Sequence, residues 1–531
     1  MEKRLLLAFV LSFLVLAIWG RLFPTSPPIP PPAVVADDEE PVEIKSAPPP
    51  PALAPQTELA AIEEETVLET EKLKIILSNI GGHIKSIELV EYSEILPVTG
   101  IVRIPGFEQS AFYLDNRTAS TARYIYDGLD VRIIKEYLIN PQTYLFDISV
   151  NLYYKEEMSS LDINKINLFS LDTSKLDKKL QKSRDLSLIE YAALINDKIS
   201  AKGNIVKYSS RDDKFTFGGI KNINETGKLD WIGFRDRYFT FILAPQFTNM
   251  GYDIYKANDS LLDFFLHTKN KSMNQFIFNA YCGPQNLETL KESGHNFQKM
   301  MRFSGWGLLD FVAKGIYMIL NFIHNIIPNW GLCIIFLGIL IYGLTYPLTL
   351  KSMASMKKMQ AIQPQIAKLK EKYKNDHQKL SKEQMELFKE HKINPMGGCF
   401  PILLQMPVFI GFYQVLWRSV MLKGANFLWI KDLSEPDRLI VFSQQYPFIG
   451  NELNILPFFM GVIMFFQQKI SSKNMNITDP AQASQQKMMM FFLPVMMLFI
   501  FYHAASGLTL YFTFFYLLTI FTQWRISKAK N

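Results

Sequence analysis

The sequence is poor in the residues that build disulfide frameworks, metal sites and catalytic centres. Only three of its 531 residues are cysteine; Cys282 lies in the polar first part, and Cys333 and Cys399 lie in or beside apolar runs. An exported domain without a disulfide framework must rely on its hydrophobic core. The chain also has no Gly-x-x-x-x-Gly-Lys loop, His-Glu-x-x-His pair or Gly-x-Ser-x-Gly elbow, so we expect no enzyme activity, no metal and no cofactor.

Charge of either sign is modest, with a net charge of +6, and the lysines gather beside apolar runs. A nucleic-acid-binding protein would instead concentrate them on a soluble face, so we expect no nucleic-acid specificity. The mean hydropathy of +0.05 combines about 300 mostly polar residues with a strongly apolar remainder. The chain is therefore expected to have a soluble part and a membrane part.

The N-terminus predicts a membrane anchor followed by a tether. Residues 1–23 contain an apolar run behind Lys3 and Arg4, which fits either an uncleaved anchor or a signal peptide. We favour the anchor, because the small-residue site near Ala36 lies far beyond the run. Residues 24–60 are rich in proline and predict an extended linker, although such tracts also serve as docking ligands.

Residues 61–300 predict a large antiparallel β domain of the sandwich type. Apolar side chains alternate with polar ones from Tyr144 to Tyr154 and again around Phe239 to Leu243, which is the period of a strand. Gly81-Gly82 and Asp127-Gly128 supply turns between strands. Residues 286–301 predict a polar helix after the last strand.

The remaining chain predicts one interfacial helix and a membrane core. Residues 301–329 repeat apolar side chains every three to four positions and suit a helix in the plane of the membrane surface, with a buried core helix as the alternative. The core, residues 330–527, contains five apolar runs long enough for spans or nearly so. They are residues 331–350, 398–418, 456–470, 488–505 and 508–525, the last two expected as a tight hairpin.

A charged insertion at residues 351–395 sets the predicted topology. It holds eleven lysines against five acidic residues, so we place it in the cytoplasm, with both termini, and the β domain outside the membrane. Its apolar residues predict a helical hairpin whose seam comprises Met359, Ile362, Ile366, Leu369, Tyr373, Met385 and Phe388. The hairpin either only sets topology or docks an anionic partner through Lys368, Lys370, Lys372 and Lys374.

Polar side chains inside the apolar runs are the candidate site. Tyr342, Gln405 and Tyr516 lie at similar predicted depths, so they line one wet groove or form hydrogen bonds between helices. We add Tyr511 to this group. Phe409, Met464 and Met496 are the candidate apolar slide, since flexible thioethers adapt to varied partners, although plain packing is the commoner use of such residues.

Several motifs in order carry a family resemblance. They are Asn329 to Gly331, Tyr346 to Thr349, Met359-Gln360, Gln363-Pro364, Asn394 to Pro401, Gln405 to Pro407, Trp429 to Leu433 and Ser506 to Leu508. Together with the anchor, linker, exported β domain and five spans, they resemble the YidC-type bacterial membrane protein insertases of the YidC/Oxa/Alb family.

The resemblance implies a supersandwich-like periplasmic β domain and an α-helical five-helix insertase core in the bacterial inner membrane. It implies an ATP-independent groove, open to cytoplasm and lipid, that receives nascent membrane proteins. The implied partners are the Sec translocon with its accessory subunits, a ribosome or signal-recognition targeting factors, and the lipid bilayer. One position departs from the family pattern: Tyr342 stands where an arginine is usual, and no Lys or Arg lies within residues 331–350.

Two other classes of function fit the sequence less well. A small-solute transporter would favour internal repeats or charged residues at mid-membrane, and neither is seen. A structural assembly factor would use the helices only as an anchor, so that changing Gln405 to Leu would not affect insertion.

Overall fold

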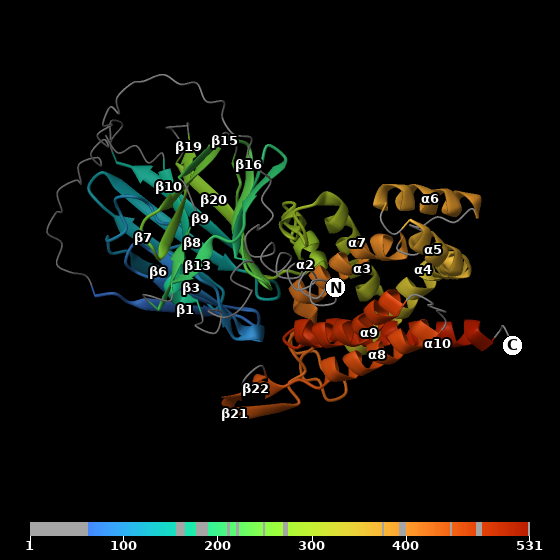
Figure 1. Cartoon of the computed structure of the whole chain (residues 1–531). Coiled ribbons are helices and arrows are strands. Elements are labelled where there is room, and N and C mark those ends of the chain that lie inside the picture. The colour runs from blue at the N-terminus through green and yellow to red at the C-terminus, as the bar shows by residue number, and fades with distance from the viewer. Residues whose placement is uncertain are drawn as a thin grey trace, which may run out of the picture. The chain divides into compact units, whose positions relative to one another are not determined.

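The computed structural model describes most of the chain beyond the predicted anchor and linker (Figure 1). Residues 1–23 and 24–60, on which those two predictions fall, lie outside the described residues. The described ranges are 62–155, 165–176, 189–209, 213–218, 222–247, 250–268, 274–373, 376–391, 400–446, 449–473 and 480–528.

Antiparallel sheets dominate the first part of the described chain. The nine-stranded sheet has the order β12 (Lys198–Lys202), β11 (Glu190–Ile195), β16 (Leu229–Arg235), β17 (Phe239–Pro245), β20 (Gln275–Pro284), β9 (Leu145–Tyr154), β8 (Val131–Ile139), β7 (Thr121–Asp127) and β6 (Tyr113–Arg117). The five-stranded sheet has the order β15 (Ile223–Gly227), β18 (Met250–Lys256), β19 (Leu261–Thr268), β10 (Lys165–Asp172) and β5 (Val98–Thr99). The smaller sheets comprise β1 (Glu65–Glu69), β2 (Leu73–Ser78), β3 (His83–Leu89) and β4 (Glu94–Ile95), and the pair β13 (Val206–Ser209) and β14 (Lys214–Phe217).

The two large sheets pack face to face through aromatic side chains. Phe169 of β10 stacks on Phe264 of the same sheet, with ring centroids 4.4 Å apart, and meets Phe241 of the nine-stranded sheet edge to face at 5.1 Å. Edge-to-face rings of this kind add to the stabilisation from burying apolar area. The predicted alternation in β9 is confirmed, because its even-numbered residues from 146 to 152 are buried and the intervening ones are less so.

The alternation predicted for β17 marks no exposed face, because every residue of this strand is buried. One face lies against the five-stranded sheet. Near its other face Tyr281 of β20 contacts Phe297, with ring centroids 6.3 Å apart, and Arg235 of β16 donates to the carbonyl of Met300. A central strand covered on both sides needs no polar face, so its pattern is uninformative.

Lys135 occupies an inward position of β8 and is fully buried. Its ammonium donates to the carbonyl oxygens of Gly81 at 2.8 Å and Val102 at 2.9 Å, which ties the predicted Gly81-Gly82 turn to the sheet. Burial and, to a lesser extent, the charge of Arg103 lower the pKa of Lys135 to about 7. A buried amine that prefers its neutral form makes stability depend on pH.

We expect the protein to become more stable as the pH rises from about 7 towards 10.5, the ordinary pKa of lysine. In this window the unfolded chain holds the proton that folded Lys135 has released, so unfolding takes up protons and becomes harder as pH rises. Lys135→Met should abolish this rise and lower the free energy of unfolding by about 1–3 kcal/mol, because two buried carbonyls lose their donor. Denaturation followed by near-UV circular dichroism at both ends of the window measures this.

The control for this experiment is Lys228→Met, which removes a lysine whose side chain is 61% exposed. It should keep the pH dependence of the unchanged protein. A Lys135→Met protein that still gains stability over the same window would show that another group is responsible.

The predicted polar helix after the last strand is interrupted. It consists of α2 (Leu287–Glu292) and a 3₁₀ turn, η5 (Phe297–Met300). Asn286 caps α2 by accepting from the backbone amides of Glu288 and Thr289. The break falls at His295 and Asn296, which both have positive φ, a conformation incompatible with a continuous helix.

Helix α3 (Gly307–Ile326) buries one narrow stripe against α7 (Phe400–Arg418), and Gly411 allows the close approach. A Cβ atom at Gly411 would lie 3.1 Å from Val312 and 3.3 Å from the backbone of Ala313. Much of the remaining surface of α3 is also apolar, with Phe311 77% and Phe322 66% exposed. The helix is amphipathic, as the sequence predicts, and its apolar surface extends beyond the buried stripe.

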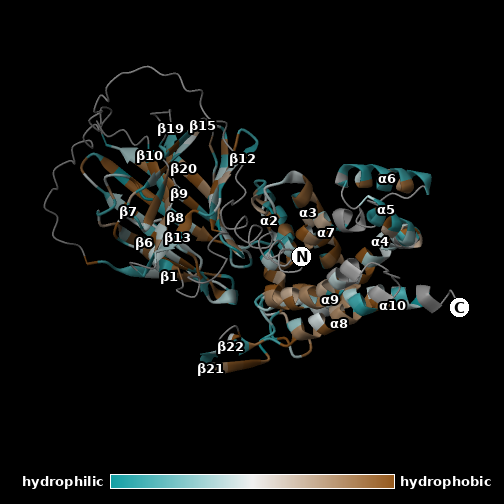
Figure 2. Cartoon of the chain, in the orientation of Figure 1, coloured by the Kyte–Doolittle hydropathy of each residue, from teal (hydrophilic) through white to brown (hydrophobic). Residues whose placement is uncertain are grey.

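The remaining helices form the predicted core region. They are α4 (Trp330–Ala361), α8 (Leu456–Lys473), α9 (Pro480–Phe501) and α10 (Ser506–Lys528), and a hairpin of β21 (Ile440–Tyr446) and β22 (Gly450–Leu453) lies between α7 and α8. Apolar residues dominate these helices (Figure 2). By length and composition alone, two described stretches suffice to cross a membrane, Gly307–Ile326 and Trp330–Ser352.

Helix α4 runs 32 residues without a break, through Pro347 and into the lysine-rich region, and the part of it that is long and apolar enough to cross a membrane is Trp330–Ser352. One expectation about these helices is wrong. Helices α9 and α10 follow each other closely in sequence, yet α10 packs mainly along α8 and α4, whereas α9 packs along α8. The expected tight pair of α9 and α10 is therefore opened.

Candidate functional site

A cavity of about 680 Å³ lies among the five core helices, α4, α7, α8, α9 and α10. It brings together four of the predicted site residues, Tyr342, Gln405, Phe409 and Tyr516, from three separate helices. The remaining lining comprises Thr345, Thr349, Met406, Met460, Gln467, Met497, Ile500, Phe501, Phe512, Phe515 and Thr519. We call this the Tyr342 cavity.

Tyr342 is fixed against α10 at the edge of this cavity. Its hydroxyl donates to the Oγ1 of Thr522 at 2.8 Å, and its ring meets Phe515 edge to face at 5.8 Å. The side chain is 9% exposed. A tyrosine thus fills this place with an aromatic ring and a hydrogen-bonded hydroxyl, and brings no charge.

Gln405 projects from α7 towards α10. Its Nε2 lies 3.4 Å from the hydroxyl oxygen of Tyr511, a long hydrogen bond. Tyr511 is 2% exposed and packs against Phe412, with ring centroids 4.3 Å apart. Tyr511 was predicted to line the groove, but the structure places it behind the wall, where it holds Gln405. It is a positioning residue for that amide.

Threonines make up much of the polar wall, and none of them is among the predicted site residues. The hydroxyls of Thr345, Thr349 and Thr519 each donate to backbone carbonyls of their own helix, at 2.8 to 3.1 Å. Their oxygens keep lone pairs for accepting hydrogen bonds. The sequence contains a signal for two of them, because residues 345 and 349 lie three and seven positions after Tyr342 and so fall on the same face of α4.

The apolar wall differs from the predicted slide. Phe409 lines the cavity as expected, but Met464 is 2% exposed and Met496 is half-buried, and neither belongs to the lining. Met460 and Met497 take their place. Met460 lies one turn before Met464 on nearly the same side of α8, whereas Met497 is one residue beyond Met496 and points about 100° away from it around α9.

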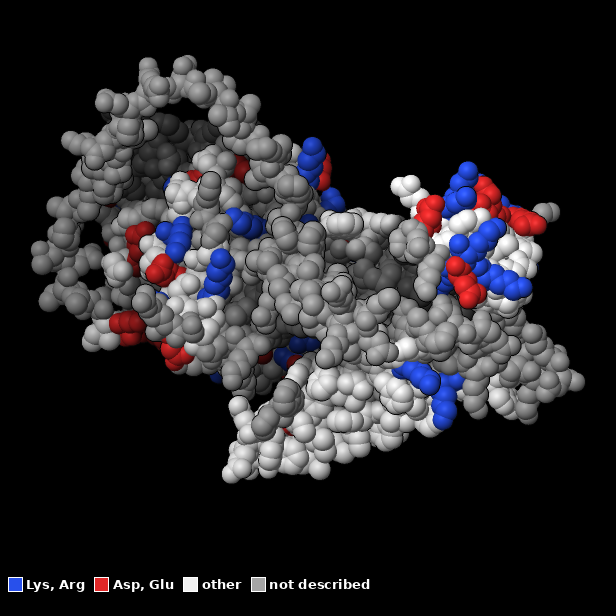
Figure 3. All heavy atoms as spheres, viewed as in Figure 1, with Lys and Arg blue, Asp and Glu red and all other residues white. Residues whose placement is uncertain are grey.

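The lysine-rich hairpin consists of α5 (Gln363–Lys372) and α6 (His377–Glu390). Ile362, Ile366 and Phe388 form its small core, as the seam predicts, whereas Met385 is 50% exposed and lies outside it. Pro364 lies in the first turn of α5 and begins a new helix after α4. Lys368, Lys370 and Lys372 are exposed, and Lys374 lies outside the described residues. Basic and acidic side chains crowd this hairpin (Figure 3).

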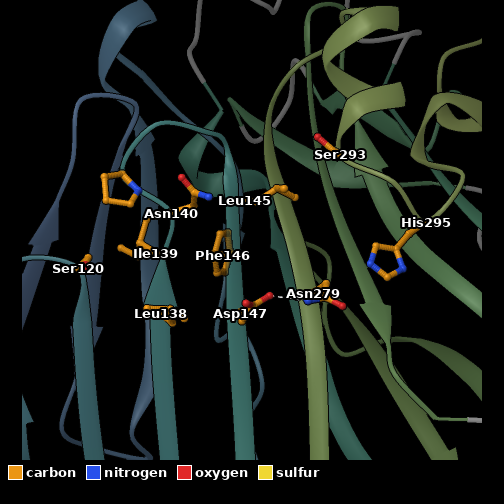
Figure 4. A pocket seen from close by; sticks show the side chains of 11 residues that line it. Ser120, Leu138, Ile139, Asn140, Leu145, Phe146, Asp147, Asn279, Ser293 and His295 are labelled. Atoms are coloured by element: carbon orange, nitrogen blue, oxygen red, sulfur yellow. Dashed lines mark hydrogen bonds between the residues drawn. The ribbon is translucent and has the colours of Figure 1, made fainter.

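A second, smaller pocket of about 410 Å³ lies in the β domain (Figure 4). Asp147 and Asn279 face each other across its floor, and Asn279 donates to the Asp147 carboxylate at 2.5 Å. His295 lies farther along the rim. Because Asp147 and Asn279 already bond to each other, the pocket offers a ligand fewer hydrogen-bonding groups than the Tyr342 cavity does.

The comparisons of the sequence with known proteins point to one family. A family model described as 60Kd inner membrane protein matches residues 322–531, and one described as YidC periplasmic domain matches residues 107–319. A protein of Pelobacter propionicus named Membrane protein insertase YidC is 30% identical over 567 residues, covering 100% of both chains. A protein of that name from Chlorobaculum tepidum is 36% identical over 332 residues, which is 60% of this chain and 54% of that protein.

The solved structures include a crystal structure of an active YidC insertase with its first transmembrane domain resolved. It covers 87% of this chain and 92% of that chain at 16% identity, with a TM-score of 0.38. A YidC crystal structure from Thermotoga maritima covers 86% of this chain at 12% identity, with a TM-score of 0.31.

Proposed function

The chain belongs to the YidC family of membrane protein insertases, and from that premise we propose that it inserts nascent transmembrane segments through the Tyr342 cavity. The segment enters from the cytoplasm, rests its polar flank in the cavity and leaves sideways into the inner membrane, without ATP hydrolysis. The observation that carries this proposal is the convergence of Tyr342, Gln405 and Tyr516, from three helices, on one cavity.

The proposed topology has the anchor at residues 1–23 and five spanning helices, α4, α7, α8, α9 and α10. The β domain lies in the periplasm and both termini in the cytoplasm. The distribution of lysine supports this, because α5 and α6 carry the densest basic charge and follow directly on α4. We place α3 in the membrane surface, where its exposed aromatic side chains contact lipid.

The composition of the cavity supports the proposal that insertion needs no ATP. Leu, Ile, Phe and Val favour the membrane by about 0.3–0.6 kcal/mol each at mid-helix, whereas a charge costs about 2.5–3.5 kcal/mol. The polar flank is thus the barrier. Gln405, Tyr516 and the threonine hydroxyls offer hydrogen bonds to that flank, while Phe409, Met460 and Met497 contact the apolar segment.

The proposed partners are assigned from the proposed topology, in which the lysine-rich hairpin lies in the cytoplasm. The nascent chain reaches the cavity from a ribosome or a signal-recognition targeting factor that docks on Lys368, Lys370, Lys372 and Lys374. The protein acts alone or beside the Sec translocon and its accessory subunits. The exposed positions among these lysines support the docking surface.

Photo-crosslinking to a stalled nascent membrane protein tests the cavity. Probes at positions 342, 405 and 516 should crosslink to the segment, whereas a probe at Phe499, 58% exposed on α9, should do so much less. The absence of crosslinks from all three cavity positions would refute the proposal.

Gln405→Leu should slow insertion of a segment with a polar flank about threefold to tenfold, because one hydrogen-bonding amide is worth about 0.5–1.5 kcal/mol. Insertion into proteoliposomes measures the rate. Met406→Leu, which changes another lining residue of the same helix without removing a polar group, should have little effect. Equal rates for both variants would favour a scaffold role for the helices.

A further inference from the structure

A two-residue turn in the segment between α7 and β21 carries two exposed apolar side chains at its tip. Phe427 and Ile430 exchange both of their backbone hydrogen bonds, each at 2.9 Å, so that Leu428 and Trp429 form the tip. Ile430 is buried, whereas Leu428 is 75% and Trp429 37% exposed. We call residues 427–430 the Leu428 turn.

The backbone of Leu428 is strained, with a φ of 53°. Two-residue hairpin turns that need a positive φ at their first tip residue favour glycine there, because a Cβ atom is crowded in this conformation. The side chain of Leu428 is mostly exposed and so makes little packing contact that could offset the strain. A strained apolar residue at an exposed tip points to a contact made outside the chain.

The first residues of α4 and α10 hold the turn in place. A Cβ atom at Gly331 of α4 would lie 2.2 Å from the Cγ of Phe427, so the phenyl ring rests directly on the helix backbone. The backbone amide of Gly507 of α10 donates to the carbonyl of Leu433, three residues after the turn, at 2.9 Å. Gly331, Leu433 and Gly507 belong to three of the motifs that carry the family resemblance, and these motifs therefore meet around the turn.

One buried carboxylate joins the turn to the start of α8. The Oδ2 of Asp437 accepts from the backbone amides of Ile455 at 2.9 Å and Leu456 at 3.1 Å, and from the indole Nε1 of Trp429 at 3.2 Å. The polar end of Trp429 is thus bonded inside the protein, while part of the side chain stays exposed. A tryptophan in this arrangement suits the boundary between lipid headgroups and acyl chains.

The exposed side of the turn continues an apolar stripe of α8. The ring of Trp429 contacts that of Phe459, with centroids 6.2 Å apart. The stripe consists of side chains at steps of three and four residues that are each about half exposed: Phe459, Val462 and Phe466. Gly331, beneath the turn, is the second residue of Trp330–Ser352, which is long and apolar enough to cross a membrane. The turn therefore lies at the end of this stretch and of the α8 stripe.

We propose that the Leu428 turn binds lipid, with Leu428 and the ring of Trp429 in the outer leaflet of the membrane, where acyl chains meet headgroups. The occupant is lipid because the exposed tip continues the apolar stripe of α8 and lies at the end of the apolar stretch of α4. The proposal rests on the topology given with the proposed function, in which this end of α8 faces outwards. Because the turn is bonded to the core helices, its contact with lipid sets the depth of the core in the membrane.

A photoreactive phospholipid with its diazirine near the headgroup end of an acyl chain tests this contact. In proteoliposomes of phosphatidylethanolamine and phosphatidylglycerol, mass spectrometry should find lipid on residues 427–430 and on the α8 stripe, but not on Leu129, which is 79% exposed in the β domain. Label on the stripe without label on the turn would overturn the lipid site and leave the proposed function standing. The absence of label from both would contradict the proposed topology, and equal label on Leu129 would show that exposure alone decides labelling.

The effect on depth is tested with Leu428→Asn. Asparagine adopts a positive φ more readily than leucine, so the fold should be retained, but the apolar contact with lipid is lost. The core should then shift outwards, which lowers the ratio of label on Phe459 to label on Phe466 about twofold or more. Leu428→Met keeps an apolar side chain and should keep the ratio. An unchanged ratio in a folded Leu428→Asn protein would show that the turn does not set the depth of the core.

Gly331→Ala tests whether α4 positions the turn. The added methyl group would displace the ring of Phe427, so the label on residues 427–430 should fall about twofold or more. Gly343→Ala is the matched control on the same helix, because a Cβ atom there meets nothing within 4 Å, and it should leave the label unchanged. Equal label on the turn in both variants would show that the contact between Phe427 and Gly331 does not hold the turn against lipid.

Discussion

Replacing Glu190 by Gln is expected to lower the free energy of unfolding by about 3–5 kcal/mol, because it leaves a buried arginine without its partner. The carboxylate of Glu190 bonds to the guanidinium of Arg235, whose side chain is only 4% exposed, and lies 3.4 Å from Arg302. Arg418 of α7 donates to the backbone carbonyl of Arg302 at 3.2 Å. One carboxylate therefore balances several cations where the β domain meets the core helices.

A matched control exists within the same domain. Glu136 pairs with Arg123 at 2.6 Å, but both side chains are more than 40% exposed, so Glu136→Gln should cost less than about 1 kcal/mol. Chemical denaturation in detergent, or hydrogen exchange of β11 and β16, compares the two variants. An equal loss of unfolding free energy in the two variants would show that burial does not strengthen the ion pair of Glu190.

Acidification should weaken the same cluster. Burial alone would raise the pKa of Glu190, but the charges of Arg235, Arg302 and Arg418 outweigh it and hold the pKa below its ordinary value of 4.5. The unfolded chain then binds this proton at a higher pH than the folded one, so the contribution is present at neutral pH and is lost as the pH falls below that value.

The fold was predictable where one side of an element meets solvent and the other a core. The alternation in β9 and the seam residues Ile362 and Ile366 are such cases, and both are buried as expected. A pattern of alternating polarity is lost where both sides of an element are covered, as in β17. Polar and apolar residues alternate along an element only when one of its sides meets water and the other meets a core.

The sequence predicts how deep the site residues lie along their helices better than it predicts the direction in which their side chains point. Tyr342, Gln405 and Tyr516 share a cavity because each is a polar group at a similar distance along its helix. Which methionines join them depends on the depth of the cavity along α8 and on the rotation of α9, and a helix that is apolar all round gives no signal for its rotation. The bond from Arg237, in the turn between β16 and β17, to the carbonyl of Ser434 was not predictable, since only the folded chain brings together residues almost 200 positions apart.

Tyr342→Arg should shift the ratio of acidic-tailed to basic-tailed substrates inserted by about tenfold towards acidic tails, which corresponds to about 1.4 kcal/mol. The Tyr342 cavity has no charged lining residue among those described, so a single guanidinium would set the electrostatic potential inside it. Two charges about 5 Å apart interact by about 3 kcal/mol at an effective dielectric constant of 20, and desolvation removes part of this. Proteoliposome insertion of paired substrates measures the ratio.

The control must place the same charge on the same helix but outside the cavity. Leu344 is two residues away on α4 and 72% exposed, so Leu344→Arg should leave the ratio near that of the unchanged protein. Tyr342→Phe separates the two properties of the tyrosine, since it removes only the bond to Thr522 and should not alter charge preference. If Tyr342→Arg slows both substrates equally, the packing of this residue against α10 matters to insertion and the charge of the cavity does not.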